Sequence, residues 1–189
     1  MSALTEKDIV NAVRQGQREG QTEMVSRYAQ RIYALIVREV TDPMDAQELT
    51  QDAFMRAFSH IDSYDPQKAS LSTWLCRIAY RLVLDFLKRS GPLIVSMENT
   101  EVSQKDISDE ELEAELSTGR EERIAQLMKL VDELPTEERM LLTLYYLEGR
   151  SLKEIAYISG VEAGVLANRL YRTRKKLYKR LCSMVSPSE

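Results

Sequence analysis

The chain has 189 residues and a net charge of -4, with 43% hydrophobic and 30% charged residues. The length fits one domain or two small ones, and the hydrophobic content excludes disorder as the default state. Glycine (7) and proline (5) are scarce, while Leu, Ala, Glu, Arg and Lys dominate. This composition predicts an all-α fold.

The two cysteines, Cys76 and Cys182, give neither a disulfide framework nor a metal-binding spacing. The N-terminal sequence MSALTEKDIV lacks the apolar core of a signal peptide, and no apolar run is long enough to span a bilayer. We therefore expect a soluble, cytoplasmic protein without membrane insertion.

The charge is unevenly distributed along the chain. Residues 98–122 hold ten acidic side chains against two basic ones. Residues 169–181, RLYRTRKKLYKRL, hold seven basic side chains and no acidic one. The near-neutral total therefore hides a basic module that follows an acidic linker.

In the first half of the chain, Thr5 and Asp8 predict a capping box for a short helix that ends near Gly16. An apolar repeat from 24 to 37 predicts a longer helix. Asp42 caps the next helix, with Pro43 at its first position. The apolar stripe of that helix is Ala46, Leu49, Ala53, Phe54 and Ala57.

The sequence HIDSYDPQKAS predicts a loop, after which Ser70 or Ser72 caps a further helix that ends at Gly91-Pro92. This helix is expected to bury Leu75, Ile78, Ala79, Leu82, Phe86 and Leu87. The acidic stretch that follows shows no helical stripe until a short segment near DEELEAEL.

A second compact unit is expected from about residue 121. Its predicted stripes are Ile124, Leu127, Met128 and Val131, then Leu141, Leu142, Leu144, Tyr145 and Leu147, which end at Gly149. Ser151 and Glu154 predict a capping box for a short helix that Gly160 closes. The last helix starts near Ala163 and buries Leu166, Leu170, Leu177 and Leu181, with Thr173 interrupting the stripe.

The predicted organisation is two small helical domains, 1–92 and 121–184, joined by an acidic linker at 93–120 and followed by a tail at 185–189.

A short helix, a glycine turn and a long basic helix form the helix-turn-helix pattern of DNA-binding proteins. Small Ala156, Gly160 and inward-facing Leu166 stand in the required register. Arg169, Arg172 and Arg174 are expected to project toward DNA from one side of the last helix, with Asn168 and Tyr171 at base edges or the backbone. A solvated basic face is the alternative, which the register disfavours.

Two surfaces of the first half are ambiguous from the residues alone. Arg77, Arg81, Lys88 and Arg89, together with Tyr64, Trp74 and Tyr80, have the cations and rings that bind unpaired nucleic acid. Composition by itself favours core aromatics beside solvated arginines. The acidic side of the third helix, with Asp45, Glu48, Gln51 and Asp52, fits a solvated face, a protein-docking surface or a metal site, in that order.

Three motifs resemble bacterial sigma factors of the extracytoplasmic-function (ECF) class of the sigma-70 family. DPMDAQELTQDAFMRAF and SLSTWLCRIAYRLVLDFLKR resemble the two signatures of sigma region 2, and residues 134–177 resemble region 4, with L-P-x-x-x-R, L-S-x-x-E-I-A and R-x-R-x-x-L patterns. The resemblance covers nearly all of the chain except the linker.

The resemblance implies a protein that binds core RNA polymerase, through the β′ clamp helices and the β flap, and directs it to promoters. An anti-sigma factor is a further candidate partner. On this basis, the residues expected to dock on polymerase are Asp45, Glu48, Gln51, Asp52 and Phe54. Recognition of the −10 element falls on Tyr64, Trp74, Arg77, Tyr80, Arg81, Lys88 and Arg89. Recognition of the −35 element falls on Asn168, Arg169, Tyr171, Arg172, Arg174, Lys175 and Lys176.

Four positions depart from the family pattern. Arg81 replaces an asparagine near the flipped −10 base, Val165 and Ala167 change the helix that reads −35, and Leu71 replaces a phenylalanine. These departures prevent transfer of a promoter sequence from the family.

The alternative function is an autonomous helix-turn-helix regulator that binds a palindromic operator as a dimer. An enzyme is not expected. The single histidine, His60, lies in a predicted loop, and the sequence has neither a glycine-rich phosphate loop nor a His/Cys metal set. No cofactor or metal is therefore expected.

Overall fold

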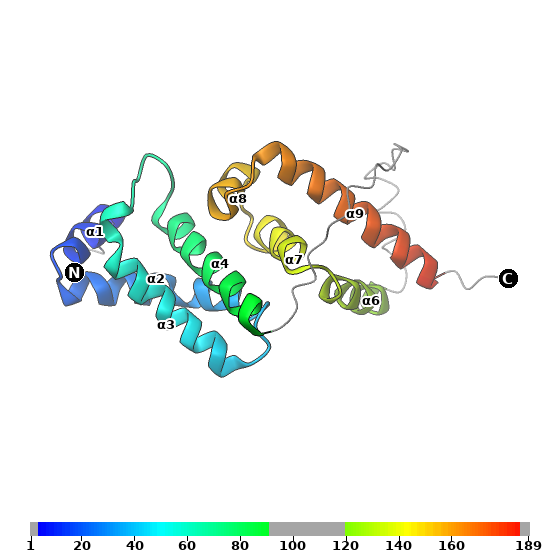
Figure 1. Ribbon diagram of the computed structural model, residues 1–189, viewed down its shortest axis with the longest axis horizontal. Helices are drawn as coiled ribbons and strands as arrows, with labels where there is room; N and C mark the ends of the chain where they lie inside the picture. Colours follow the sequence, from blue (N-terminus) through cyan, green and yellow to red (C-terminus); the bar gives the residue numbers. More distant parts are fainter. Residues whose placement is uncertain (1–3, 91–119, 186–189) are drawn as a thin grey trace.

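The computed structural model describes residues 4–90 and 120–185 of the chain. Within these ranges the chain is helical and contains no strand, which confirms the predicted all-α class. The helices form two units that lie side by side (Figure 1). The predicted acidic linker lies outside the described residues except for Arg120, and so does the short helix expected near DEELEAEL.

The first unit contains α1 (Glu6–Arg14), α2 (Arg18–Ile36), α3 (Pro43–Ser59), the 3-10 turn η1 (Ile61–Ser63) and α4 (Leu71–Ser90). The predicted caps are present. Thr5 and Asp8 form a capping box, and the Asp42 carboxylate accepts a hydrogen bond of 2.7 Å from the Met44 backbone N–H. Of the two candidates for the cap of α4, Ser70 takes the role, because its hydroxyl accepts from the Thr73 backbone N–H at 3.2 Å.

The core of the first unit is apolar and includes the predicted stripe of α3. Helices α1 and α2 approach each other so closely at Gly20 that a Cβ there would lie 2.6 Å from the Cβ of Ala12. A hydrogen is the only side chain that this crossing accepts without movement.

The second unit contains α6 (Arg120–Asp132), α7 (Thr136–Leu142), one π-helical turn (Thr143–Leu147), α8 (Leu152–Ser159) and α9 (Ala163–Val185). Ser151 and Glu154 form the predicted capping box. Gly160 ends α8 with a φ of 80°, a left-handed conformation that favours glycine.

The predicted stripe of α6 is partly wrong. Ile124 and Met128 are exposed, whereas Leu130 and Leu134 are buried. The buried row passes through Leu127 and Leu130, so the face of α6 that packs on α9 lies one row around the helix from the predicted one.

The second predicted stripe fails at its end, where Tyr145 and Leu147 are exposed. The cause is the π turn, in which the Glu148 backbone N–H donates to the Thr143 carbonyl at 3.0 Å. This turn adds one residue to the helical repeat and rotates the following side chains out of the α-helical register. Thr173, which interrupts the stripe of α9, is itself buried and donates a hydrogen bond to Glu138 at 3.3 Å.

The two units meet where α8 packs against α4 (Figure 1). The first residues of α4, from Leu71 to Cys76, are all buried. Helix α4 therefore packs against elements of both units.

Candidate nucleic-acid interface and docking surface

Helix α9 carries a line of polar side chains along its outer side. Asn168, Arg172, Lys175 and Lys179 follow each other at spacings of four, three and four residues, which places them on one helical face. The opposite face holds the buried Leu166, Leu170 and Leu177. The outer face is therefore the cationic side of α9, which an anionic ligand such as a nucleic-acid backbone can approach.

Other predicted residues of α9 occupy different positions. Arg174 lies two residues beyond Arg172 and so points to nearly the opposite side of the helix, which corrects the expectation that Arg169, Arg172 and Arg174 share one side. Arg169 forms an ion pair of 2.9 Å with Glu137 of α7. The Lys175 ammonium lies 5.8 Å from the centre of the Tyr171 ring, while Tyr171 and Lys176 are exposed.

The α8–turn–α9 segment has the geometry of a helix-turn-helix. Ile155 and Ile158 of α8 and Leu166 of α9 are buried, and the Gly160 backbone N–H donates to the Ala156 carbonyl at 2.9 Å. The turn therefore presents the N-terminal part of α9 to solvent, as major-groove readers of this class require.

The residues of the first unit that were predicted to bind unpaired nucleic acid fall into a buried group and an exposed group. The rings of Tyr64 and Trp74 pack together, with centres 5.5 Å apart, and are buried. Tyr80 is also buried. Burial raises the pKa of Tyr80 to about 12, the Glu137 carboxylate acts in the same direction, and the Arg169 cation opposes it.

Arg77 is half-buried, and its guanidinium lies 4.8 Å above the ring of Tyr157 in α8. Arg81, Lys88 and Arg89 are exposed. The exposed cations therefore lie toward the C-terminal end of α4, and the aromatic platforms lie in the core.

On α3, Glu48, Gln51 and Asp52 are exposed and Asp45 is half-buried, but Phe54 is buried and 6.3 Å from the Phe58 ring. Sequence reasoning missed Met44 and Met55, which are 79% and 62% exposed. Met44, Glu48, Gln51 and Met55 follow each other at spacings of four, three and four residues, so all four lie on one exposed face of α3. We call this face the ridge of α3. Met44 and Met55 lie on the polar side of the predicted helix. Two large apolar residues on that side are the signal in the sequence that could have identified this surface.

Two family matches coincide with the two units. Residues 24–92 match the family described as Sigma-70 region 2, and residues 124–177 match the family described as Sigma-70, region 4. The chain belongs to the sigma-70 family of RNA polymerase sigma factors. Within the family it belongs to the ECF class.

The relatives of this sigma factor include two with similar sequences. The ECF RNA polymerase sigma factor SigE of Mycolicibacterium smegmatis is 32% identical over 158 residues, which cover 82% of this chain and 59% of that protein. The ECF RNA polymerase sigma factor SigW of Bacillus subtilis is 28% identical over 181 residues, which cover 93% of this chain and 96% of that protein.

Solved structures share the fold of this sigma factor. CnrH, in complex with the cytosolic domain of CnrY, has a TM-score of 0.64 at 20% identity, covering 94% of this chain and 97% of that one. RpoE of Bartonella quintana, in complex with the anti-sigma factor NepR, has a TM-score of 0.58 at 18% identity, covering 86% and 96%.

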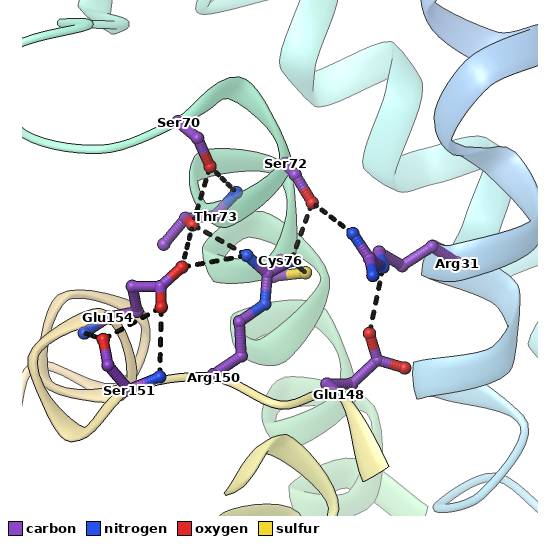
Figure 2. Close-up of polar contacts among 9 residues, drawn as sticks. All are labelled: Arg31, Ser70, Ser72, Thr73, Cys76, Glu148, Arg150, Ser151 and Glu154. Atoms are coloured by element: carbon purple, nitrogen blue, oxygen red, sulfur yellow. Dashed lines mark hydrogen bonds and ion pairs between the residues drawn. The ribbon is translucent and has the colours of Figure 1, made fainter.

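Between its two units the sigma factor has a polar cluster that sequence reasoning missed (Figure 2). The Arg150 side chain, 8% exposed, donates hydrogen bonds to Ser72 Oγ at 2.7 Å, Thr73 Oγ1 at 3.0 Å and Glu154 Oε1 at 3.1 Å. It also lies 3.6 Å from the Cys76 sulfur. The residues come from segments almost eighty positions apart, so no local pattern announces the cluster.

Glu154 has two roles in this cluster. Its Oε2 accepts from the Ser151 backbone N–H at 3.0 Å, and its Oε1 accepts from the Thr73 hydroxyl at 3.0 Å. Burial acts to raise the pKa of Glu154, but hydrogen bonds from Ser151, Arg150 and Thr73 outweigh it and lower the pKa to about 2. The carboxylate is therefore ionised whenever the protein is near neutral pH.

Further ion pairs join the units. Arg31 of α2 pairs with Glu148 at 3.0 Å, as Figure 2 shows, and Arg139 of α7 pairs with Glu39 at 2.8 Å. In the described residues, no helix is long and apolar enough to cross a membrane.

Proposed function

We propose that this sigma factor docks on core RNA polymerase through α3 and reads promoter DNA at two places. The −35 duplex meets the outer face of α9, and the −10 strand meets α4 and the loop that precedes it. Initiation takes place in the cytoplasm and involves no covalent step by this chain. An anti-sigma factor is a further proposed partner, because the similar chains CnrH and RpoE were solved with the cytosolic domain of CnrY and with NepR.

The observation that carries the proposal is the presence of two surfaces of opposite charge on separate units. The ridge of α3 combines Glu48 and Asp52 with the exposed Met44 and Met55. Charged rims around adaptable apolar side chains are typical of protein-docking surfaces. Phe54, which is buried, supports this ridge from below.

On α9, Asn168 and Arg172 are exposed, as are Tyr171, Arg174 and Lys176. We assign Arg172 and Lys176 to phosphates and Asn168 to a base edge, because cations position the helix and amides discriminate bases. Arg169 must first leave Glu137 to contact DNA. Arg174 lies on nearly the opposite side of α9 from Arg172, so we assign to it only a contact with a flanking phosphate.

On α4, Arg81, Lys88 and Arg89 supply the accessible cations for the −10 strand. Trp74, Tyr64 and Tyr80 are buried, so their part in base capture requires movement of the surrounding residues. An autonomous regulator would account for α9 alone and leave the ridge of α3 without a role.

The test is co-elution with bacterial core RNA polymerase on a sizing column. We expect the wild-type chain to co-elute and the Glu48→Ala/Gln51→Ala variant to separate from polymerase. Gln15→Ala/Glu19→Ala changes the same residue types at exposed positions near the start of α2 and is the matched control. If the double variant on α3 binds as well as this control, the docking assignment is wrong.

The DNA assignment is tested by Arg172→Ala. We expect weaker use of a −35-dependent promoter, with polymerase binding unchanged. Loss of polymerase binding instead would contradict the division of roles between the two units.

A further inference from the structure

We propose that Arg14, at the end of α1, is a positioning residue for the loop that joins α3 to α4, and through it for the choice of bases in the −10 strand. This loop comprises residues 60–70 and is called the α3–α4 loop below. The proposal rests on the proposed role of the loop and of α4 in meeting the −10 strand.

The tip of the α3–α4 loop is a compact turn with exposed side chains. The Asp65 carboxylate accepts a hydrogen bond from the Gln67 backbone N–H at 3.0 Å, and the Asp65 carbonyl accepts from the Lys68 backbone N–H at 3.1 Å. Pro66, Gln67 and Lys68 are exposed. These hydrogen bonds lie within the turn, so they give it a shape but do not determine how it is oriented on the first unit.

The two ends of the turn are attached to the first unit. After the turn, Ser70 caps α4. Before it, the ring of Tyr64 packs against Trp74, and both rings are buried. The packed ring leaves open the direction of the peptide group that follows Tyr64, where the chain leaves η1 in an extended conformation with φ -72° and ψ 126°. The orientation of that peptide group sets the direction in which the turn projects.

Arg14 holds this peptide group from another helix. Its Nη2 donates a hydrogen bond of 3.2 Å to the Tyr64 carbonyl, and its Nε forms an ion pair of 3.6 Å with the Asp62 carboxylate. A guanidinium presents several donors in a fixed planar arrangement, so one arginine can orient both groups at once. Arg14 is the last residue of α1, which packs against η1, so its backbone has a defined place beside the loop.

The contacts of Arg14 are suited to orienting the loop rather than to stabilising the fold. The side chains of Arg14 and Asp62 are 38% and 92% exposed, so water screens their ion pair. Removal of Arg14 therefore leaves the core of the first unit intact, while the turn loses the hydrogen bond that orients it. Base recognition requires precisely placed groups, so a small shift of the turn changes which base edges Gln67 and Lys68 meet.

A fluorescence measurement on the free, full-length chain tests the orientation of the loop without DNA or polymerase. Trp74 is the single tryptophan of the chain and packs against Tyr64. We expect Arg14→Ala to make acrylamide quench the Trp74 emission faster. Arg14→Lys, which keeps the charge but lacks the planar set of donors, should lie between Arg14→Ala and the wild type. Arg18→Ala, a change at an exposed arginine at the start of α2, is the matched control.

Transcription by the same variants with bacterial core polymerase tests the choice of bases. On a promoter library randomised across the −10 element, we expect Arg14→Ala to lower the ratio of preferred to non-preferred sequences by about three- to tenfold. Arg18→Ala should keep the wild-type ratio. Binding to core polymerase and the thermal midpoint by circular dichroism should match the wild type for both variants. Because Arg14 also contacts Asp62, the combined Arg14→Ala/Asp62→Ala variant should show less than the product of the two single effects.

A folded Arg14→Ala chain in which Trp74 is quenched as in the control would overturn the positioning of the loop. Faster quenching with an unchanged −10 ratio would overturn the effect on base choice and leave Arg14 a purely structural residue. If Trp74 responds but the wild-type chain starts no transcription with core polymerase, the proposed sigma function fails. The role in base choice then fails with it, while the contact of Arg14 with the loop stands.

Discussion

Arg139 of α7 donates a hydrogen bond of 2.8 Å from Nε to one oxygen of Glu39, and its Nη2 forms an ion pair of 2.8 Å with the same oxygen. Glu39 has a side-chain exposure of 0%, and its other carboxylate oxygen, Oε1, has no hydrogen-bond partner in the part of the chain that the structure describes. The same arginine donates from Nη1 to the Asp132 carbonyl at 2.9 Å. Arg139, the arginine of the L-P-x-x-x-R motif, thus connects the end of α6 to the first unit.

Glu39→Gln should destabilise the fold less than Glu39→Ala does, because the amide oxygen can still accept the hydrogen bond from Arg139. Burial raises the pKa of Glu39, although the hydrogen bond and charge of Arg139 oppose that shift. A raised pKa in the folded state gives stability that is full below the ordinary value of 4.5 and is lost as pH rises through the folded pKa. The introduced amide does not titrate, so the free energy of unfolding of the variant rises relative to that of the wild type as pH increases above 4.5, which urea titrations would show.

Glu39→Ala is the matched comparison, because it removes the acceptor and leaves Arg139 without it. We expect a loss of about 1–3 kcal/mol. If Glu39→Gln and Glu39→Ala were equally destabilising, the charge of Glu39 rather than its hydrogen bond would be the stabilising feature.

Glu154→Gln should show the opposite pH dependence. The pKa of Glu154 is lowered to about 2 from 4.5 in the folded chain, so its contribution is present above pH 4.5 and is lost as pH falls toward 2. The difference in thermal midpoint between wild type and Glu154→Gln should therefore be largest near neutral pH and shrink below pH 4.5. A difference that does not change with pH would mean that the capping geometry, not the ionised carboxylate, is what matters.

Gly20→Ala should destabilise the first unit by about 1–3 kcal/mol, because the added methyl group overlaps Ala12 at the crossing of α1 and α2. Thermal unfolding followed by circular dichroism measures the loss. Gly164→Ala is the control, since a Cβ at Gly164 meets no atom of the described residues within 4 Å. It should leave the midpoint unchanged or raise it, because alanine favours the helix.

Met55→Ser should weaken binding to core polymerase by about three- to tenfold without changing stability, because it removes apolar surface from the α3 ridge. Fluorescence anisotropy with labelled sigma factor measures the affinity. Val25→Ser, a similar change at an exposed apolar position of α2, is the control. Equal effects of the two changes would remove Met55 from the docking surface.

Arg81→Asn should change the −10 sequence that the sigma factor prefers. Arginine offers only donors, whereas asparagine offers both donors and an acceptor, so the two side chains select different base edges. Transcription from a promoter library randomised across the −10 element, compared between wild type and Arg81→Asn, gives the preference. Identical preferences would place Arg81 on the phosphate backbone.

Interactions between residues close in sequence were sufficient to predict many of the helix ends. The caps at Thr5, Asp42 and Ser151 and the left-handed Gly160 follow from hydrogen bonding within a few residues of each helix end, so the sequence alone determined them. The three family motifs likewise lie within continuous segments and revealed the sigma-70 resemblance.

Tertiary structure decided what depends on partners distant in sequence. The π turn at Thr143–Leu147 and the packed row of α6 changed which side chains are buried, because neighbouring helices selected the face. Arg150 meets Ser72 and Thr73 only after both units have formed. Residue type and spacing carry no record of such a contact, because only the packing of the two units brings its partners together.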